Sequence, residues 1–324
     1  MKIENVFAAI ISIALLVSCS QQQKPAVAGN SSTVDTTLEA RISNMISLEL
    51  DTIAGDAGQV IVMETSTGKI KAMTSVVRLS DENKYRGGLL DLHIPNRFDR
   101  CAQYLVLLEQ GMDTLSTIDT GNGIWKANQE EIYDATYYRG GYGKLTMARA
   151  LEIGSDIYFA KALYGKFKAF QGPAIDAETK KLGWNPDGSA LDITAFMNAI
   201  ANDGKLLKPV TEGEGNIVIK EHITSHQDHI KLLQVNLAHS VTQGLGRKCK
   251  PSTSDAAALP INLKLDESHF LLDICGYFPV SNPKYTIFVS IVKKDIPASA
   301  GGMSGPLFAR VADLMTEYDK SKQP

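Results

Sequence analysis

The chain has 324 residues, 44% of them hydrophobic and 21% charged, and its formal net charge is −3 at pH 7. This balance lacks the positive excess typical of nucleic-acid-binding proteins, so we expect no nucleic acid as a partner. It suits a soluble globular protein that is large enough for one domain, or for one domain with a lobe.

The first 18 residues have the features of a signal peptide. Lys2 precedes an apolar run over 6–17, which is too short to span a bilayer as a permanent helix. The run ends in Leu16-Val17-Ser18-Cys19, which resembles a bacterial lipobox. The predicted product is cleaved before Cys19 and carries acyl chains there, each buried methylene adding about 0.8 kcal/mol to membrane binding. The alternative is a plain secretory signal with an incidental cysteine.

Residues 19–38 are rich in Gln, Ser, Thr, Ala and Gly and lack apolar periodicity. Such a segment buries too little surface to offset its ordering entropy, so we expect a flexible tether. The tether would join the membrane to a folded domain over 39–322. Ser20 directly after Cys19 favours the outer membrane, with the domain facing the periplasm of a bacterial cell envelope.

The predicted domain begins with a helix and a β-hairpin. Residues 39–50 place apolar side chains at helical spacing. Residues 58–64 are rich in β-branched side chains and predict a strand, and the alternating pattern of 69–76 predicts the return strand. The polar turn between them contains Gly68, which is free to adopt a left-handed conformation.

Helical spacing dominates the middle of the chain, with helices predicted over 101–110 and 193–201 and a further one closing at 241–247. A helical pattern over 145–152 leads into 153–163, and this stretch resembles a helix-loop-helix. Gly111 and the triplet 202–204 are typical helix stops. Strands follow over 270–278 and 285–292, and a final helix over 306–318. This order predicts an α/β (α+β) fold, in which both chain ends build one antiparallel sheet covered by helices and an all-helical lobe is inserted between them.

Several short motifs resemble the penicillin-binding-protein transpeptidase domain of the serine β-lactamase/transpeptidase-like superfamily. The first hairpin ends in Ala-Met-Thr-Ser over 72–75, and 117–123 resembles the family's Asp-Thr-Gly-Gly segment. A helix ends in Ala-Asn-Asp-Gly-Lys over 201–205, and a late strand ends in Gly-Tyr-Phe-Pro over 276–279. The resemblance covers 58–318 and implies the transpeptidase architecture and an acyl-transfer reaction on a serine.

The resemblance implies a nucleophile in the family motif Ser-x-x-Lys. Aligned through Pro95, the serine position holds Arg97 and the lysine position holds Arg100, and no residue of 93–100 carries a hydroxyl. An arginine is neither a nucleophile nor a base. Cys101 is the nearest thiol, and we expect it to be a buried core cysteine rather than a catalytic thiolate.

The family's second motif, Ser-x-Asn, matches Gly154-Ser155-Asp156 here, so the hydroxyl is lost and a carboxylate replaces the amide. One hypothesis pairs Asp156 with Arg97 or Arg100, which would fill the former active site. The other treats Ser155 and Asp156 as an ordinary helix N-cap. The sequence leaves both open.

The third family motif, Lys-Thr-Gly, falls at Leu259-Pro260-Ile261. The cation and hydroxyl that would bind a substrate carboxylate are therefore absent from the motif. Pro260 also removes an N–H that an edge strand could offer to a peptide. We expect a closed or altered cleft.

Two other residue types raise the question of metal binding and disulfides. His222, His226 and His229 invite a metal hypothesis, but Ser225 is predicted to cap the helix, so we favour solvated histidines and expect neither a metal nor a cofactor. Cys101, Cys249 and Cys275 are an odd set in an exported chain. Three buried free thiols are favoured over one disulfide with one free thiol.

Loss of three motifs predicts a non-catalytic, lipid-anchored transpeptidase-like protein. Its role would be binding, either to a protein of a cell-envelope complex or to peptidoglycan. The alternative is a working peptidoglycan transpeptidase, carboxypeptidase or other acyl hydrolase whose nucleophile has been relocated.

Overall fold

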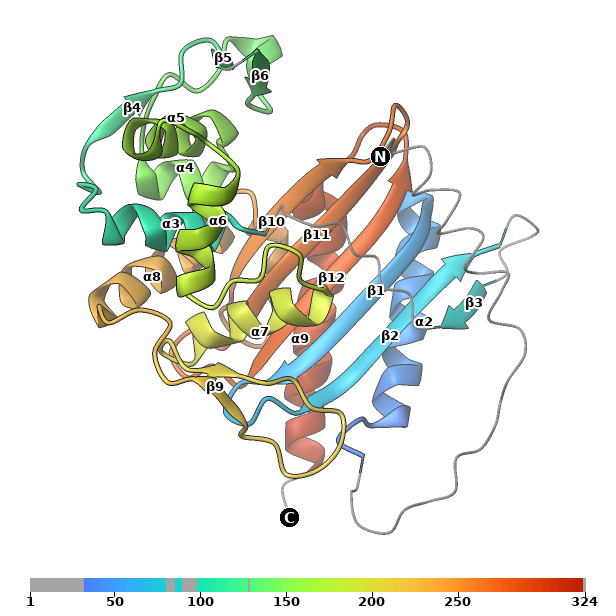
Figure 1. Cartoon of the computed structure of the whole chain (residues 1–324). Coiled ribbons are helices and arrows are strands. Elements are labelled where there is room, and N and C mark those ends of the chain that lie inside the picture. The colour runs from blue at the N-terminus through green and yellow to red at the C-terminus, as the bar shows by residue number, and fades with distance from the viewer. Residues whose placement is uncertain (1–31, 80–84, 89–97, 128, 323–324) are drawn as a thin grey trace.

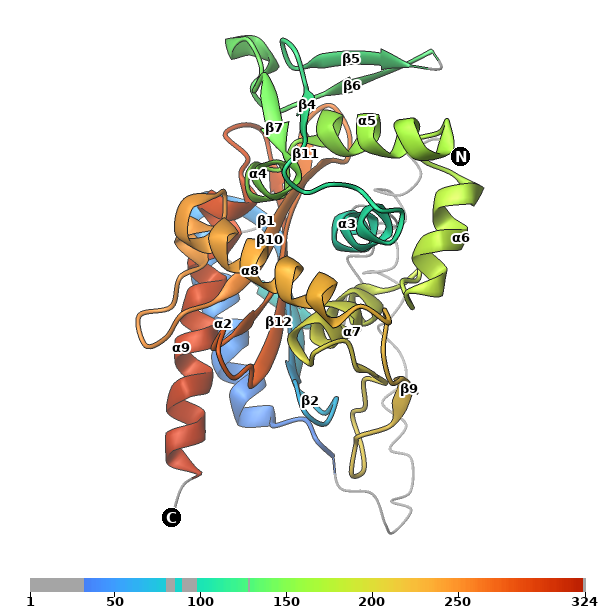
Figure 2. The same cartoon turned by 90° about the vertical axis from the view of Figure 1, so that its left-hand side faces the viewer.

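The computed structural model describes residues 32–79, 85–88, 98–127 and 129–322. A twisted six-stranded sheet forms one part of the molecule, and a mostly helical lobe lies beside it (Figure 1). Helices α2 (Thr36–Ile53) and α9 (Gly305–Ser321) cover one side of the sheet, whereas the lobe lies on the opposite side (Figure 2). The predicted signal peptide and Cys19 lie outside the described residues.

The sheet is built from both ends of the chain, as the sequence predicts. Its strand order is β10-β11-β12-β1-β2-β3, and all neighbouring strands are antiparallel. Strand β10 is therefore the edge that borders the lobe in Figure 1. The strands are β1 (Gly55–Glu64), β2 (Ile70–Arg78), β3 (Tyr85–Gly88), β10 (Ala257–Lys264), β11 (His269–Phe278) and β12 (Tyr285–Lys294).

The alternation of side chains along each strand divides the interior into two hydrophobic cores. In β1, Val60 and Val62 contribute to the core under α2 and α9, whereas Ile61 and Met63 contribute to the core shared with the lobe. Both cores are necessary because the sheet is covered on two faces. This explains why β1 and β12 are buried almost continuously rather than alternating with exposed positions.

The lobe is inserted between β3 and β10, and helix α7 packs from it onto the sheet against β11 and β12. The expected all-helical lobe is wrong in detail, because three short strand pairs, β4–β7, β5–β6 and β8–β9, belong to the described part of this insertion. Its helices are α3 (Arg100–Glu109), α4 (Met147–Ile153), α5 (Asp156–Phe167), α6 (Pro173–Lys181), α7 (Ala190–Ala201) and α8 (Gln227–Gln243). Its short strands are β4 (Thr117–Asp119), β5 (Ile124–Ala127), β6 (Glu130–Tyr133) and β7 (Lys144–Thr146), with β8 (Leu206–Leu207) and β9 (Val218–Lys220) forming a further pair.

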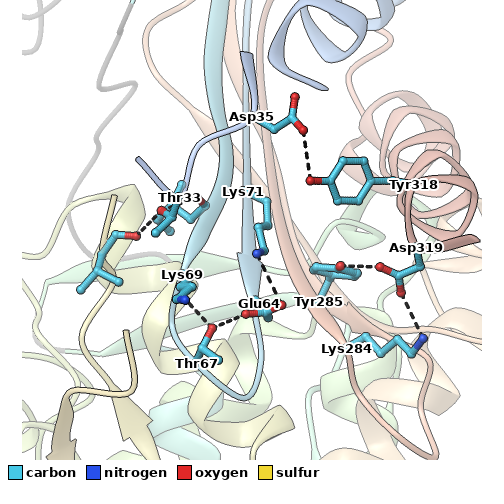
Figure 3. A network of polar contacts seen from close by, with 12 residues as sticks. Thr33, Asp35, Glu64, Thr67, Lys69, Lys71, Lys284, Tyr285, Tyr318 and Asp319 are labelled. Atoms are coloured by element: carbon cyan, nitrogen blue, oxygen red, sulfur yellow. Dashed lines mark hydrogen bonds and ion pairs between the residues drawn. The ribbon is translucent and has the colours of Figure 1, made fainter. Parts of the chain in front are cut away.

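Polar contacts fasten the outer helices to one end of the sheet (Figure 3). The Tyr318 hydroxyl near the end of α9 donates to Asp35, the residue that caps α2, at 3.1 Å. The next residue, Asp319, accepts hydrogen bonds from the Tyr285 hydroxyl at 2.6 Å and from Lys284 Nζ at 3.0 Å. These contacts join residues more than 30 positions apart, so they hold α2, α9 and the β11–β12 turn together.

Cys101, Cys249 and Cys275 are buried free thiols, which confirms the favoured prediction and excludes a disulfide among them. Burial raises the pKa of Cys101 and of Cys249 to about 12 and raises that of Cys275 well above the usual value of a thiol. Within the described ranges, no helix is both long enough and apolar enough to cross a membrane.

Candidate functional site

The candidate site lies where the first turn of α3 meets the first turn of α5. Of the two arginines that the motif alignment predicts at the Ser-x-x-Lys positions, Arg97 lies outside the described residues. Arg100 is the first residue of α3 and Asp156 is the first residue of α5. Helix α3 packs against α5, and the first residues of the two helices are in contact.

Arg100 is fixed by three different partners. Its Nη2 donates to Asp156 Oδ1 at 2.5 Å, and its Nη1 donates to Gln103 Oε1 at 3.1 Å. The guanidinium also lies 4.5 Å from the centre of the Phe159 ring, which favours a cation through its negative face. The Arg100 side chain is only 15% exposed, whereas that of Asp156 is 47% exposed. The ion pair that the sequence suggested between Arg100 and Asp156 is therefore present.

Ser155 is the N-cap of α5, so the second hypothesis for this stretch is also correct. Its Oγ accepts the Tyr158 N–H at 3.2 Å and donates to the two carboxylate oxygens of Asp134 at 3.0 and 2.9 Å. Asp134 also accepts the Ile157 N–H at 3.1 Å. Ser155 and Asp156 thus divide the two roles, since one caps the helix and the other binds the arginine.

Asp134 is a site residue that the sequence did not reveal. It lies in the loop after β6, 21 positions before Ser155, and its side chain is almost completely buried. Burial raises the pKa of the Asp134 carboxyl, and the hydrogen bonds from Ile157 and Ser155 oppose that shift. No spacing rule links a loop aspartate to a distant helix cap, so only the fold brings the two together.

Gly154 has a conformational reason for standing where the family has a serine. It ends α4 with φ of 66°, in the left-handed region that favours glycine. A Cβ added there would lie 3.3 Å from Leu245 Cδ1, so even a small side chain would press on this leucine, which follows the end of α8. The tight α4–α5 reversal of this chain therefore favours glycine over the relay hydroxyl.

Strand β10 carries the third motif position and is closed on its lobe side. Leu259 is buried in the same core cluster as Cys101, and Ile261 packs against that cluster. Pro260 is also buried and pairs with Ile274 in the neighbouring strand β11. Helix α8 packs along β10, and an added Cβ at Gly301 would lie 3.7 Å from Pro260 Cγ. These contacts account for the burial of Leu259 and Pro260, while the closed or altered cleft stays a prediction.

Cys101, the thiol next to Arg100 in sequence, and Ser155, the hydroxyl within the second motif, are both unsuited to attack a substrate. Cys101 is 1% exposed, and its thiol is strongly disfavoured as a thiolate by burial. Ser155 is fully buried, and its Oγ is committed to Asp134 and to the helix start. A pocket of the lobe is lined instead by Asp113, Lys161 and Lys166, away from these motif positions.

The three histidines of the metal hypothesis lie before and at the start of α8. The N-cap of α8 is His226 and not Ser225, so the predicted cap is displaced by one residue. His222 lies before the helix, as expected, and interacts with Gln227 at 3.3 Å. His226 and His229 stack on each other with ring centres 4.7 Å apart.

The comparison with solved structures finds proteins of similar fold, whereas the two sequence comparisons find no match. No family model matches the chain, and no curated protein matches its sequence. Solved structures do match. A peptidoglycan glycosyltransferase from Burkholderia ambifaria aligns with a TM-score of 0.70 at 17% identity, covering 89% of this chain and 98% of that one.

Two further structures are penicillin-binding proteins. The transpeptidase domain of penicillin-binding protein 3 from Burkholderia pseudomallei aligns with a TM-score of 0.69 at 16% identity, covering 93% of this chain and all of that one. Penicillin-binding protein 3 from Mycobacterium tuberculosis, solved with aztreonam, aligns with a TM-score of 0.71 at 14% identity over 93% of this chain and 82% of that one. The chain therefore has the fold of penicillin-binding-protein transpeptidase domains.

Proposed function

We propose that this chain is a non-catalytic transpeptidase-like protein that is lipid-anchored through Cys19 and acts by binding in the bacterial cell envelope. The observation that carries the proposal is the ion pair between Arg100 and Asp156. In the motif alignment, these residues occupy the positions of the family's lysine base and substrate-binding asparagine. Each is engaged by the other, and arginine retains its proton at any physiological pH.

A penicillin that acylates its target tests the loss of covalent chemistry. The purified full chain is incubated with a fluorescent penicillin beside an active penicillin-binding protein, and both are denatured before electrophoresis. We expect label on the active protein only, because Cys101 and Ser155 are buried. Covalent label on this chain that disappears in a particular Ser→Ala variant or in Cys101→Ala would overturn the proposal and identify the relocated nucleophile.

An exposed tyrosine cluster beside the site supports a protein partner over a glycan. Tyr133, Tyr137 and Tyr138 are 44%, 49% and 66% exposed, and neighbouring rings meet edge to face at 5.4 and 5.8 Å. Arg139 lies 5.1 Å from the Tyr138 ring. Tyrosine and arginine are the side chains enriched at the centres of protein interfaces. Asp134 anchors this loop to Ser155, so the cluster is held on the structured lobe.

Affinity capture from envelope extracts identifies the partner. The full chain and a Tyr137→Ser/Tyr138→Ser variant are compared, with Tyr164→Ser as a control because that tyrosine packs against Trp125 and is not part of the exposed cluster. We expect a protein captured by the wild type and the control and lost with the double variant. Equal sedimentation of all three with purified peptidoglycan, without a captured protein, would instead favour the glycan.

The proposed anchor is tested separately from the binding role. Cells expressing the chain are fed a palmitate analogue that can be detected in gels, and membranes are fractionated. We expect label and membrane association in the wild type and neither in Cys19→Ser. A Cys19→Ser protein that still carries label would show that the lipid is attached elsewhere or that the signal is processed differently.

A further inference from the structure

Arg100 begins α3, and at the other end of this helix a carboxylate lies close to two histidines. Glu109 is the last residue of α3, and its Oε1 lies 3.2 Å from His229 Nδ1. Its Oε2 lies 3.8 Å from His226 Nε2. These residues are more than 110 positions apart in the chain, so the fold and not local spacing brings them together.

The spacing of the ligand atoms suits one metal ion. Zinc binds imidazole nitrogen at about 2.0–2.1 Å and carboxylate oxygen at about 2.0–2.2 Å, so two ligands of one tetrahedral ion lie roughly 3.3 Å apart. Ligand atoms of His226, Asp228 and His229 all lie within 4.8 Å of one another. The Glu109 Oε1–His229 Nδ1 distance of 3.2 Å is close to the tetrahedral value, whereas the Glu109 Oε2–His226 Nε2 distance of 3.8 Å is longer, so the carboxylate would shift slightly to share one ion with both imidazoles.

The backbone and neighbouring side chains hold these groups in position. His226 precedes the first turn of α8 and makes no capping bond with its side chain, while His229 lies three residues further on. Residues three apart share one side of a helix. The Thr224 hydroxyl donates to Glu109 Oε1 and accepts the His226 N–H at 3.1 Å, so it orients both a ligand carboxylate and the helix start. Second partners of this kind commonly orient metal ligands.

The side chains of His229, Glu109 and His226 become increasingly exposed to solvent in that order. The side chain of His229 is 17% exposed, that of Glu109 is 27% exposed and that of His226 is 56% exposed. An ion held there would have protein ligands on its inner side and an open side toward water. The rings of His226 and His229 stack with their centres 4.7 Å apart, so both imidazoles are presented on the same side of the start of α8.

We propose that Glu109, His226 and His229 form a binding site for a divalent metal of the zinc class, with Asp228 as a further carboxylate ligand. The site joins the end of α3 to the start of α8. Because α8 packs along the edge strand β10, the metal would stabilise the junction between the lobe and the sheet. The inference is independent of whether the chain has lost acyl-transfer activity.

The first test is a zinc titration of the full chain, purified without a polyhistidine tag and stripped with a chelator. Zn²⁺ alone is added at pH 7.5 in competition with a chromophoric chelator. We expect saturation at one ion per chain and a weaker affinity at pH 5.5, where protons compete for the imidazoles. Absence of saturable binding at pH 7.5 would overturn the site.

Single variants distinguish zinc binding at this site from non-specific zinc binding by other histidines of the chain. Glu109→Gln, His226→Gln and His229→Gln are each expected to weaken zinc binding by more than about tenfold, and Thr224→Val by about tenfold, as for partners that orient ligands. His239→Gln is the control, because His239 lies in the same helix and pairs with a different carboxylate, Glu152, at 3.4 Å. Equal affinity in His229→Gln and the wild type would refute the proposal.

A spectroscopic measurement on the wild-type chain tests the site without variants, so its result does not depend on whether a variant folds. X-ray absorption of the zinc-loaded wild type is expected to show two imidazole ligands together with oxygen ligands. Co²⁺ in place of Zn²⁺ should give the visible absorption of a four- or five-coordinate ion. A shell composed of oxygen atoms alone would overturn the assignment, whatever the variants show.

Discussion

The contact between Arg100 and Asp156 can be measured by a double-mutant cycle. Arg100→Met keeps side-chain length and removes the charge, and Asp156→Asn keeps shape and removes the charge. The 2.5 Å contact is partly buried on the arginine side and half exposed on the aspartate side. A partly exposed pair of this kind is worth about 1 kcal/mol, close to the upper end for surface pairs.

The single variants lose more than the pair. Arg100→Met also removes the hydrogen bond to Gln103, worth about 1 kcal/mol, and the contact with Phe159, worth about 0.5–1 kcal/mol. We therefore expect a loss of about 2–3 kcal/mol. Asp156→Asn should lose the pair together with about 0.3–1 kcal/mol from its position in the first turn of α5. The double variant should be about 1 kcal/mol more stable than the sum of the two losses predicts.

The assay is urea unfolding of all four proteins at low and at high salt. A coupling of about 1 kcal/mol that decreases in 1 M salt is the expected result, because screening weakens a half-exposed ion pair. Arg41→Met serves as the control partner for Arg100→Met, since Arg41 lies in α2 and pairs with Glu317. Additivity within about 0.3 kcal/mol for Arg100 and Asp156 would refute the contact and, with it, the main support for the proposed function.

Two other predictions concern the sheet and its edge. Burial raises the pKa of Asp273 to about 7, whereas the same carboxyl in an unfolded chain has a pKa of about 3.9. Between these two values the folded state binds one proton more than the unfolded state. The free energy of unfolding should therefore fall by on the order of 4 kcal/mol as the pH rises from 4 to 7. In Asp273→Asn this decrease of the free energy of unfolding with pH should disappear, as measured by urea unfolding at several pH values. An unchanged pH dependence would contradict the raised pKa of Asp273. Gly301→Ala should cost about 1–3 kcal/mol, because its Cβ would lie 2.0 Å from the Leu245 carbonyl oxygen. A neutral effect in the same assay would show that the α8–β10 junction is loose.

Periodic apolar patterns explain why most of the sheet and helices could be predicted. Strand β1 and strand β12 are buried on both faces and rich in β-branched residues, so their identity is strongly encoded. Helix α7 ends at Ala201 with Asn202 as its C-cap, and Gly204 adopts φ of 94°, as its sequence indicates. These features depend on neighbours within a few positions, which a single sequence displays directly.

The small strand pairs of the lobe and the contacts of the site could not be predicted in the same way. Strand β6 has four residues that are mostly exposed, so it lacks the apolar alternation that indicates a strand. The bond between Asp134 and Ser155 and the contact between Glu109 and His229 join distant segments. Such pairs are specified by packing of whole helices, and no local pattern records them.

The two ends of α3 connect the proposed function with the proposed metal site. At one end Arg100 is bound by Asp156, and at the other Glu109 meets His229. Catalytic sites commonly hold groups that are strained or incompletely satisfied, at a cost in stability. Here the charged groups at both ends of the helix have partners. Under the proposed function, the position that holds the lysine base in the family is free to carry Arg100 in a stabilising contact with Asp156.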